Sequence, residues 1–461
     1  MFFRWHFESR LLFSSRWLFG SCVLLPICFT SLALAQITPR IASEPCRNAQ
    51  STSVVELDRR MTSLRTTLDN LERTRAKLSP TAKSQRQELD KKIRANQETL
   101  IELTFALECY RRDLQDDPVL ITDTERPAPP TRGKGSGGQR RSTWTAITTY
   151  YATNREWTGK GDYGSNRTQK LEYGRAEVSI PTSRQPGELP LPILWKLELT
   201  PDPNKHFILK NVEPLKGNAV RSELSSVLGS TDTKSVLLFV HGYNTSFADV
   251  ALRTAQLAHD LSFRGLPMFF SWPSAGSIRG YFRDEEMAQL SEPAFNQVLE
   301  DIAALGATDV YLIAHSLGNR LVTNVLKQRT KRPSPKISEL LLAAPDINEE
   351  IFREQIVPAL ATMQNTRRTI YASSNDVALK AAKIAHDFRR VGDANGGVLT
   401  FAGYDTVDMS QAAPIVRAYG HSYVMDSPRV LNDIADTFIR RKPIGERGLV
   451  QNPPNTFWSL R

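Results

Sequence analysis

The chain has 461 residues, of which 40% are hydrophobic and 23% are charged. This composition is typical of a globular protein and excludes a largely disordered chain or one built mainly of membrane spans. The net charge of +10 would suit nucleic-acid binding, but the excess basic residues lie in the segments 1–16, 126–141 and 440–461. We expect these segments to be flexible rather than part of a folded surface, so the sequence does not predict nucleic-acid binding.

Residues 1–35 have the features of a secretory signal peptide. Three arginines precede the apolar stretch 17–35, which ends in the small-x-small triplet "ALA" that signal peptidases prefer. We therefore expect an exported protein, located in the periplasm of a Gram-negative bacterium. Because the stretch is nearly long enough to span a bilayer, an uncleaved anchor in the inner membrane through residues 17–35 is the alternative.

Residues 46–115 carry a heptad pattern in two arms. Apolar side chains recur at alternating steps of three and four, the pattern breaks at Pro80, and it then resumes. This predicts an antiparallel coiled-coil hairpin that serves as a spacer or contacts a membrane surface or a protein. Cys46 and Cys109 are nearly equidistant from the break, so the hairpin would bring them together as a disulfide in an oxidising compartment. Two unpaired buried thiols are the alternative.

The segment 116–143 is rich in Pro, Gly and Ser and is predicted to be a flexible linker. Beyond it, "AEVSIP" and "LWKLELT" predict early strands. Short apolar runs then alternate with helical patterns, which predicts an α/β domain over residues 144–441 with a largely parallel sheet. The last segment, 442–461, has no clear periodicity and is predicted to be a C-terminal tail. The apolar runs are 236–240, 267–270, 310–314, 340–343, 369–372 and 398–401.

The run 310–314 leads directly into the pentapeptide Ala-His-Ser-Leu-Gly, with Ser316 at its centre and a helical pattern after it. This resembles the nucleophile elbow G-x-S-x-G, with alanine in place of the first glycine. The tight strand-to-helix turn exposes the serine hydroxyl and leaves room only for small neighbours. Ser316 is therefore the candidate nucleophile.

A serine hydroxyl needs a base to take its proton and a carboxylate to orient that base. His421 lies in a glycine-flanked loop after the last predicted strand and is the candidate base, whereas His386 falls within a helical pattern. The candidate acid is Asp376, which follows the penultimate predicted strand and could also cap the helix after it. Asp346 is the alternative acid, although Asp346 and Glu349 also resemble a helix capping box.

The tetrahedral intermediate of acyl transfer needs backbone donors for its oxyanion. The run 236–240 ends in His-Gly-Tyr-Asn, and the amides of Tyr243 and Leu317 are the candidate oxyanion donors. His241 is expected to shape this loop rather than to act as the base, because it precedes the serine in the chain.

These residues together resemble the α/β-hydrolase superfamily and, more closely, the bacterial esterase- and lipase-like family DUF900. The resemblance implies an α/β-hydrolase fold, with a mostly parallel central sheet flanked by helices, and a triad of Ser316, Asp376 and His421. It covers residues 173–424 and leaves out the hairpin and the linker. The matching segments are "YGRAEVSIP", "LLFVHGYNTSFADVALRTAQLAHDL", "FFSWPSAG", "YLIAHSLGNRL", "LLLAAPDIN", "YASSNDVAL" and "GHSYV".

The sequence thus predicts an exported serine hydrolase that cleaves a small-molecule or lipid ester, or a related acyl bond, through an acyl-enzyme. The alternative is a non-catalytic envelope protein that binds a partner through the hairpin and uses the hydrolase fold as a scaffold. No zinc-binding His-Glu-x-x-His motif and no cluster of Cys and His is present, so neither a metal nor another cofactor is predicted.

Overall fold

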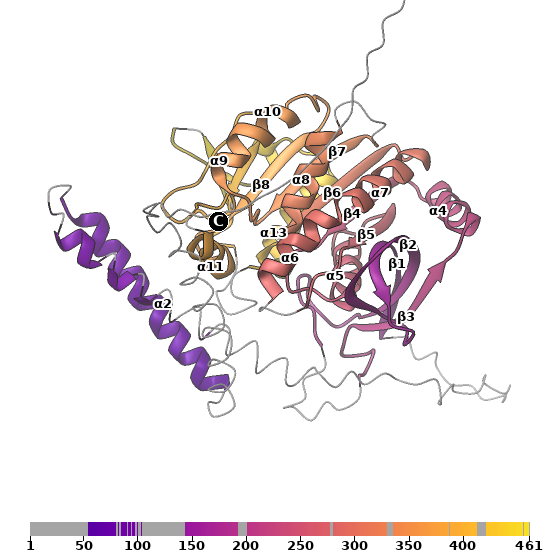
Figure 1. Ribbon diagram of the computed structural model, residues 1–461, viewed down its shortest axis with the longest axis horizontal. Coiled ribbons are helices and arrows are strands. Elements are labelled where there is room, and N and C mark those ends of the chain that lie inside the picture. The colour runs from indigo at the N-terminus through magenta and orange to yellow at the C-terminus, as the bar shows by residue number, and fades with distance from the viewer. Residues whose placement is uncertain are drawn as a thin grey trace, which may run out of the picture.

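The computed structural model describes residues 54–79, 143–191, 201–276, 280–329, 335–386, 388–412, 421–454 and 456–460, with short stretches between 82 and 103. At its centre is one sheet, in the spatial order β10-β11-β9-β8-β7-β6-β4-β5-β1-β2-β3 (Figure 1). From β11 to β1 in this spatial order, every pair of neighbouring strands runs parallel. The outer pairs β1–β2, β2–β3 and β10–β11 run antiparallel. The strands are β1 (Trp144–Trp157), β2 (Tyr163–Pro181), β3 (Ile208–Leu215), β4 (Ser235–Val240), β5 (Leu266–Ser271), β6 (Asp309–His315), β7 (Ile337–Ala343), β8 (Arg367–Ala372), β9 (Asp405–Asp408), β10 (Val450–Asn452) and β11 (Phe457–Ser459).

Helices cover both faces of the sheet (Figure 1). One face packs against α4 (Asn218–Ser230), α6 (Tyr281–Leu290), α7 (Glu292–Ala304), α8 (Gly318–Gln328), the π-helix η3 (Phe352–Ile356) and α10 (Val357–Leu360). The other face packs against α5 (Phe247–Asp260), α11 (Val377–His386), α12 (Tyr423–Asp426) and α13 (Pro428–Phe438). The short helix α9 (Glu349–Ile351) leads into η3, and the 3₁₀ helix η5 (Ile444–Glu446) follows α13.

The central strands are apolar at every position because both of their faces are covered. In β4, Val236, Leu238 and Val240 join one hydrophobic core, whereas Leu237 and Phe239 join the other. Successive side chains of a strand point to opposite faces, so an uninterrupted apolar run fills two cores at once. This alternation explains why the strands are read from the sequence as continuous rather than alternating patterns.

Five of the six predicted runs lie in parallel strands, namely β4 to β8, and this confirms the α/β fold class. The sixth prediction is wrong. Residues 398–401 form no strand, and the strand in this part of the chain is β9, Asp405–Asp408. Leu399 and Phe401 are apolar because they bury their side chains in the core beside Phe352, not because they pair in the sheet.

The C-terminal segment is part of the folded domain, contrary to the predicted tail over 442–461. β11 pairs in parallel with β9, and β10 pairs with β11, so the segment completes one edge of the sheet. Its basic residues are also held by the domain: Arg447 forms a buried ion pair with Asp433, and Lys442 lies 3.0 Å from Asp436. The expectation of a flexible basic C-terminus therefore does not hold.

In the N-terminal region, α2 (Val54–Lys77) confirms the first predicted helical arm, and Met61 on its heptad seam is buried. Only parts of the second arm are described, and these are helical, so the hairpin stays a prediction. The predicted signal peptide, Cys46, Cys109, the linker up to residue 142 and the segment "LWKLELT" lie outside the described residues. Of the helices that the structure describes, none has the length and hydropathy needed to cross a membrane.

Candidate active site

Ser316 lies on the turn between β6 and α8, where the nucleophile elbow was predicted. Its φ angle is +52°, in the left-handed region that residues other than glycine rarely adopt. The backbone amide of Ser316 donates to the carbonyl oxygen of Ala343 at 3.0 Å, and the amide of Asn319 donates to the carbonyl of Ser316 at 3.1 Å. These two bonds tie the turn to β7 on one side and to the first turn of α8 on the other.

Small neighbours make this turn sterically feasible. A β-carbon on Gly318 would overlap the carbonyl oxygen of His241, and one on Gly242 would lie 2.6 Å from Cβ of Ser316. The loop after β4 therefore touches the serine directly. Gly318 is required by this close packing against β4 and not by its own backbone conformation, since its φ angle is ordinary for a helix.

Asp376 and His421 come together although 45 positions separate them in the chain. Nδ1 of His421 lies 2.7 Å from Oδ2 of Asp376, and both side chains are buried. Oδ1 of Asp376 accepts a hydrogen bond from the amide of Leu379 at 3.0 Å. The same carboxylate thus caps α11 with one oxygen and contacts the histidine with the other.

The contact with Asp376 sets the protonation of His421. An ionised carboxylate only accepts hydrogen bonds, so Nδ1 carries the proton and Nε2 keeps its lone pair in the neutral ring. Nε2 is buried and has no hydrogen-bond partner among the described residues. Burial lowers the pKa of His421, but the charge and the hydrogen bond of Asp376 outweigh burial and hold this pKa above the ordinary 6.5.

His315 links the loop of His421 to the elbow. The Nε2–H group of His315 donates to the carbonyl oxygen of His421 at 3.1 Å, and the two ring centroids are 4.6 Å apart. Burial, followed by the charge of His421, lowers the pKa of His315 to about 3, so its ring stays neutral. Because His315 directly precedes Ser316, this contact places the backbone of the candidate base beside the candidate nucleophile.

Asp346 occupies a different environment from Asp376. Its amide donates to the carbonyl of Ser316 at 3.3 Å, but its carboxylate accepts from the hydroxyl of Tyr281 at 2.6 Å. The carboxylate also pairs with Arg390 at 3.2 Å and with Arg320 at 3.4 Å. Within the described residues it makes no hydrogen bond to His421. The predicted capping box does not form either, because the side chain of Asn348 caps α9 instead.

The other two histidines considered lie apart from the Asp376–His421 pair. The ring of His241 stacks on Trp272 with centroids 4.7 Å apart, and the indole nitrogen of Trp272 donates to the carbonyl of His241 at 2.9 Å. Burial, with a further contribution from the charge of Arg155, holds the pKa of His241 well below its ordinary value. Nε2 of His386, at the end of α11, lies 2.9 Å from the carboxylate of Glu285.

The candidate oxyanion donors belong to the two loops that meet at the serine. Tyr243 follows Gly242, and Asn244 after it has a φ angle of +53°. Leu317 directly precedes α8, and the first amides of a helix have no intrahelical acceptor. Sequence reasoning missed the residues behind the first loop, Arg155 and Asp284, which are fully buried. No periodic or motif signal marks either residue, because their contacts are made across the fold.

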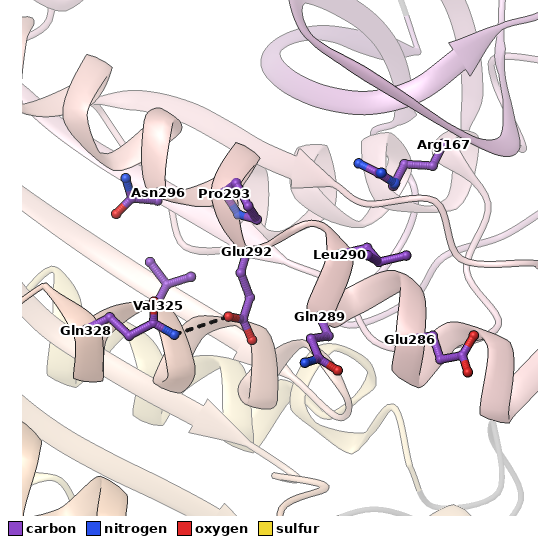
Figure 2. A pocket seen from close by; sticks show the side chains of 9 residues that line it. All are labelled: Arg167, Glu286, Gln289, Leu290, Glu292, Pro293, Asn296, Val325 and Gln328. Atoms are coloured by element: carbon purple, nitrogen blue, oxygen red, sulfur yellow. Dashed lines mark hydrogen bonds between the residues drawn. The ribbon is translucent and has the colours of Figure 1, made fainter. Parts of the chain in front are cut away.

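A groove of about 790 Å³ lies elsewhere on the molecule, and Figure 2 shows the side chains that line it. None of Ser316, Asp376 and His421 lines this groove, so it is not the candidate active site. Its rim joins the β1–β2 hairpin to α6, α7 and α8, and a hydrogen bond from Gln328 to Glu292 crosses it. The lining residues are Arg167, Glu286, Gln289, Leu290, Glu292, Pro293, Asn296, Val325 and Gln328.

In the part of the chain that the structure describes, no group of three or more His, Cys, Asp or Glu is placed to hold a metal ion.

Several solved structures are similar to this chain. The hyperthermophilic esterase from the archaeon Pyrobaculum calidifontis is 12% identical, over 57% of this chain and 80% of that chain, with a TM-score of 0.27. A thermostable esterase from Pseudomonas putida ECU1011 is 11% identical, over 64% and 81% of the two chains, with a TM-score of 0.27. Thermogutta terrifontis esterase 2 is 15% identical, over 45% and 82%, with a TM-score of 0.25. No curated protein matches the sequence.

The family comparison is specific to the domain that carries the elbow. Residues 216–441 match the family described as alpha/beta hydrolase of unknown function (DUF900). The matched segment runs from the start of α4 to the end of α13, so it contains the parallel strands β4 to β9 and all three residues of the candidate triad. Residues 216–441 are thus identified as an α/β-hydrolase domain that matches the DUF900 family.

Proposed function

We propose that this protein is a serine hydrolase that cleaves a carboxylic ester or a related acyl bond through an acyl-enzyme intermediate. The observation that carries the proposal is the 2.7 Å contact between Asp376 and His421, beside an elbow on which Ser316 has a φ angle of +52°. A buried carboxylate that orients a histidine, together with a serine on a strained strand-to-helix turn, is the arrangement that activates a hydroxyl for attack. The substrate class we propose is a small-molecule or lipid ester.

In the first half of the reaction, Nε2 of His421 takes the proton of the Ser316 hydroxyl as Oγ attacks the ester carbonyl carbon. The carbonyl π electrons move onto oxygen, and the amides of Tyr243 and Leu317 donate to the resulting oxyanion. Asp376 stabilises the imidazolium without taking its proton. The intermediate then collapses: the bond to the alcohol oxygen breaks, and the leaving alkoxide receives the proton from Nε2.

In the second half, water replaces the alcohol. His421 takes a proton from this water as the water oxygen attacks the acyl carbon. The amides of Tyr243 and Leu317 again donate to the oxyanion of the second tetrahedral intermediate. Collapse breaks the bond to Oγ, and Ser316 regains its proton from the imidazolium. The products are a carboxylic acid and an alcohol, and the enzyme returns to its starting state.

We further propose that the chain is exported, with residues 1–35 as its signal, a coiled-coil hairpin over 46–115 and a disulfide between Cys46 and Cys109. The sequence patterns alone support these proposals. N-terminal sequencing of the periplasmic protein would show whether cleavage follows residue 35. Non-reducing peptide mapping that finds both cysteines as free thiols would contradict the disulfide.

The experiment that tests the hydrolase proposal is labelling of the full-length protein with a fluorophosphonate, followed by a panel of esters of increasing acyl length. We expect Ser316→Ala to abolish both labelling and turnover, because the nucleophile is deleted. Ser230→Ala, which changes an exposed serine on α4, serves as the matched control and should leave both unchanged. Neither labelling nor ester turnover in the unmodified protein would instead favour the non-catalytic scaffold.

A further inference from the structure

A buried carboxylate lies directly behind the loop of the candidate oxyanion donor. Asp284, on α6, is fully buried, and its Oδ2 accepts a hydrogen bond from the amide of Asn244 at 3.1 Å. Its Oδ1 accepts from the amide of Ala275 at 2.7 Å. One side chain thus binds the loop after β4 and the loop after β5 at the same time.

Ser274 forms a second link between these two loops. Its hydroxyl donates to Oδ2 of Asp284 at 2.5 Å and accepts from the amide of Thr245 at 3.0 Å. The amides of Asn244 and Thr245, the two residues that follow Tyr243, are therefore held by one hydrogen-bond network. Ser274 belongs to the "SWPSAG" segment, whose tryptophan stacks on His241 at the start of the same loop.

Arg155 closes the network from β1. Its guanidinium donates to the carbonyl oxygen of Thr245 at 2.7 Å, to the carbonyl of Ser274 at 3.1 Å and to the hydroxyl of Ser271 at 2.8 Å. The side chain is fully buried, and no carboxylate hydrogen-bonds to it among the described residues. Burial lowers the pKa of Arg155 to about 10 and raises the pKa of Asp284 above its ordinary value. Taking two such groups out of water is costly, and the hydrogen bonds of this network offset that cost.

We propose that Arg155, Ser274 and Asp284 form a clamp whose role is to position the backbone amide of Tyr243 for the oxyanion. The inference rests on the proposed hydrolase function. All three are positioning residues, because they act through the loop and not on the substrate.

The conformation of the loop gives the physical reason. Asn244 has a φ angle of +53°, in the left-handed region, which asparagine tolerates better than most residues but which surrounding contacts still hold in place. The bond from its amide to Asp284 fixes the peptide group that follows Tyr243. An oxyanion donor works only when it is held at the position of the developing charge, and a displacement of about 1 Å can cost roughly 100-fold in rate.

Asp284→Asn and Ser274→Ala test the clamp in the full-length enzyme. Asparagine supplies one acceptor oxygen where aspartate supplies two. The backbone amide of either Asn244 or Ala275 therefore loses its acceptor and faces the NH₂ group of the new side chain. We expect kcat to fall about 100-fold in Asp284→Asn and about tenfold in Ser274→Ala, with KM changed less than about threefold. A trifluoromethyl ketone with the acyl group of the ester that the enzyme turns over fastest in the panel forms an oxyanion on Ser316, so its Ki should rise by the same factor as kcat/KM falls.

Asp260→Asn is the matched control. Asp260 is also buried, accepts from the amide of Gly187 at 2.9 Å and pairs with Arg184, but it lies at the far end of α5. It should lower the melting temperature and leave kcat and the Ki of the ketone within about twofold.

The outcomes separate the two proposals. Unchanged kcat and Ki per folded molecule in both clamp variants, with only a lower melting temperature, would overturn the clamp and leave the hydrolase function standing. If Asp284→Asn does not fold, the kcat and Ki of Ser274→Ala decide alone. An unmodified enzyme that neither turns over esters nor reacts with the fluorophosphonate would overturn the hydrolase function, and the clamp with it.

Discussion

Backbone strain in this protein is concentrated at the carboxyl ends of the central strands. Of the six described residues other than glycine with positive φ, Asn244, Ser316 and Ala344 follow β4, β6 and β7. This conformation costs on the order of 1–2 kcal/mol for Ser316 and Ala344, and less for Asn244, because asparagine tolerates the left-handed region better. Neighbouring parallel strands end at one edge of a sheet, so this strain gathers around the serine. Strain of this kind persists where surrounding contacts over-determine the backbone, as the elbow and the clamp do here.

At the residue scale, the two candidate acids are distinguished by their partners. We expect Asp376→Asn to lower kcat by about 10⁴-fold, the size of the loss when the triad aspartate of a serine protease is replaced, because the wrong imidazole tautomer is then favoured. Asp346→Asn should lower kcat far less. It should instead cost about 3 kcal/mol of unfolding free energy, because Arg320 and Arg390 lose their shared anion.

The measurement is ester turnover of both variants at matched folding, checked by circular dichroism and urea unfolding. Loss of turnover in Asp346→Asn with full activity in Asp376→Asn would move the acid to the end of β7.

The raised pKa of His421 predicts the pH dependence. The base must be unprotonated to accept the serine proton, so kcat/KM should rise with pH and level off above a pKa higher than 6.5. Asp376 supplies the charge and the hydrogen bond that raise this pKa, whereas burial opposes them. In Asp376→Asn, the rate of fluorophosphonate labelling should therefore titrate at a lower pH than in the unmodified enzyme. A titration at higher pH in this variant would contradict the assignment.

At the element scale, the junction of β6 with α8 depends on close backbone packing against β4. A β-carbon on Gly318 would meet the carbonyl oxygens of His241 and Val240, which are backbone atoms and cannot rotate away. We expect Gly318→Ala to push α8 off β4 and to cost about 1–3 kcal/mol of unfolding free energy, with a large loss of activity.

Gly229→Ala is the matched control for this prediction. Gly229 lies in α4, and a β-carbon there would have nothing within 4 Å. The change should stabilise the protein by about 0.5–1 kcal/mol, since alanine is the better helix former. Urea unfolding of both variants checks the pair. Equal stability of the two variants would show that the junction tolerates a side chain.

At the scale of the whole molecule, the C-terminal segment closes one edge of the sheet and is anchored by one buried ion pair. Arg447 donates through Nε to Asp433 at 3.0 Å, and the hydroxyl of Tyr371 on β8 donates to the same carboxylate. The ion pair thus connects the segment before β10 and β11 with α13, and through Tyr371 with β8 in the sheet.

We expect Arg447→Ala to cost about 3–5 kcal/mol of unfolding free energy, because Asp433 is left as a buried charge without its cation. The control is Arg264→Ala, whose pair with Asp232 is exposed and should contribute no measurable stability. Urea unfolding followed by circular dichroism measures both. If the stability of Arg447→Ala lies within about 0.5 kcal/mol of the unmodified protein, the usual size of surface changes, the ion pair does not anchor the C-terminal segment.

Features that are encoded locally can be predicted from the amino-acid sequence alone. Strands β4 to β8 are buried on both faces, so their apolar runs identify them without knowledge of the fold. The elbow at Ser316 is a short-range motif, because the strand, the turn and the helix are contiguous in the chain. The chain order of serine, acid and histidine then singled out Asp376 and His421, which the structure brings to 2.7 Å. Their catalytic role stays a prediction.

Features that depend on partners distant in the chain become evident only in the folded protein. β9 is the short segment Asp405–Asp408, which forms a strand because β8 and β11 offer it hydrogen-bond partners. β11 lacks a long apolar run for the same reason, since pairing rather than burial holds an edge. Asp284 and Arg155 became visible only when the loops after β4 and β5 met. A buried polar side chain leaves no periodic trace in a sequence, because its position is fixed by hydrogen bonds to residues on other elements.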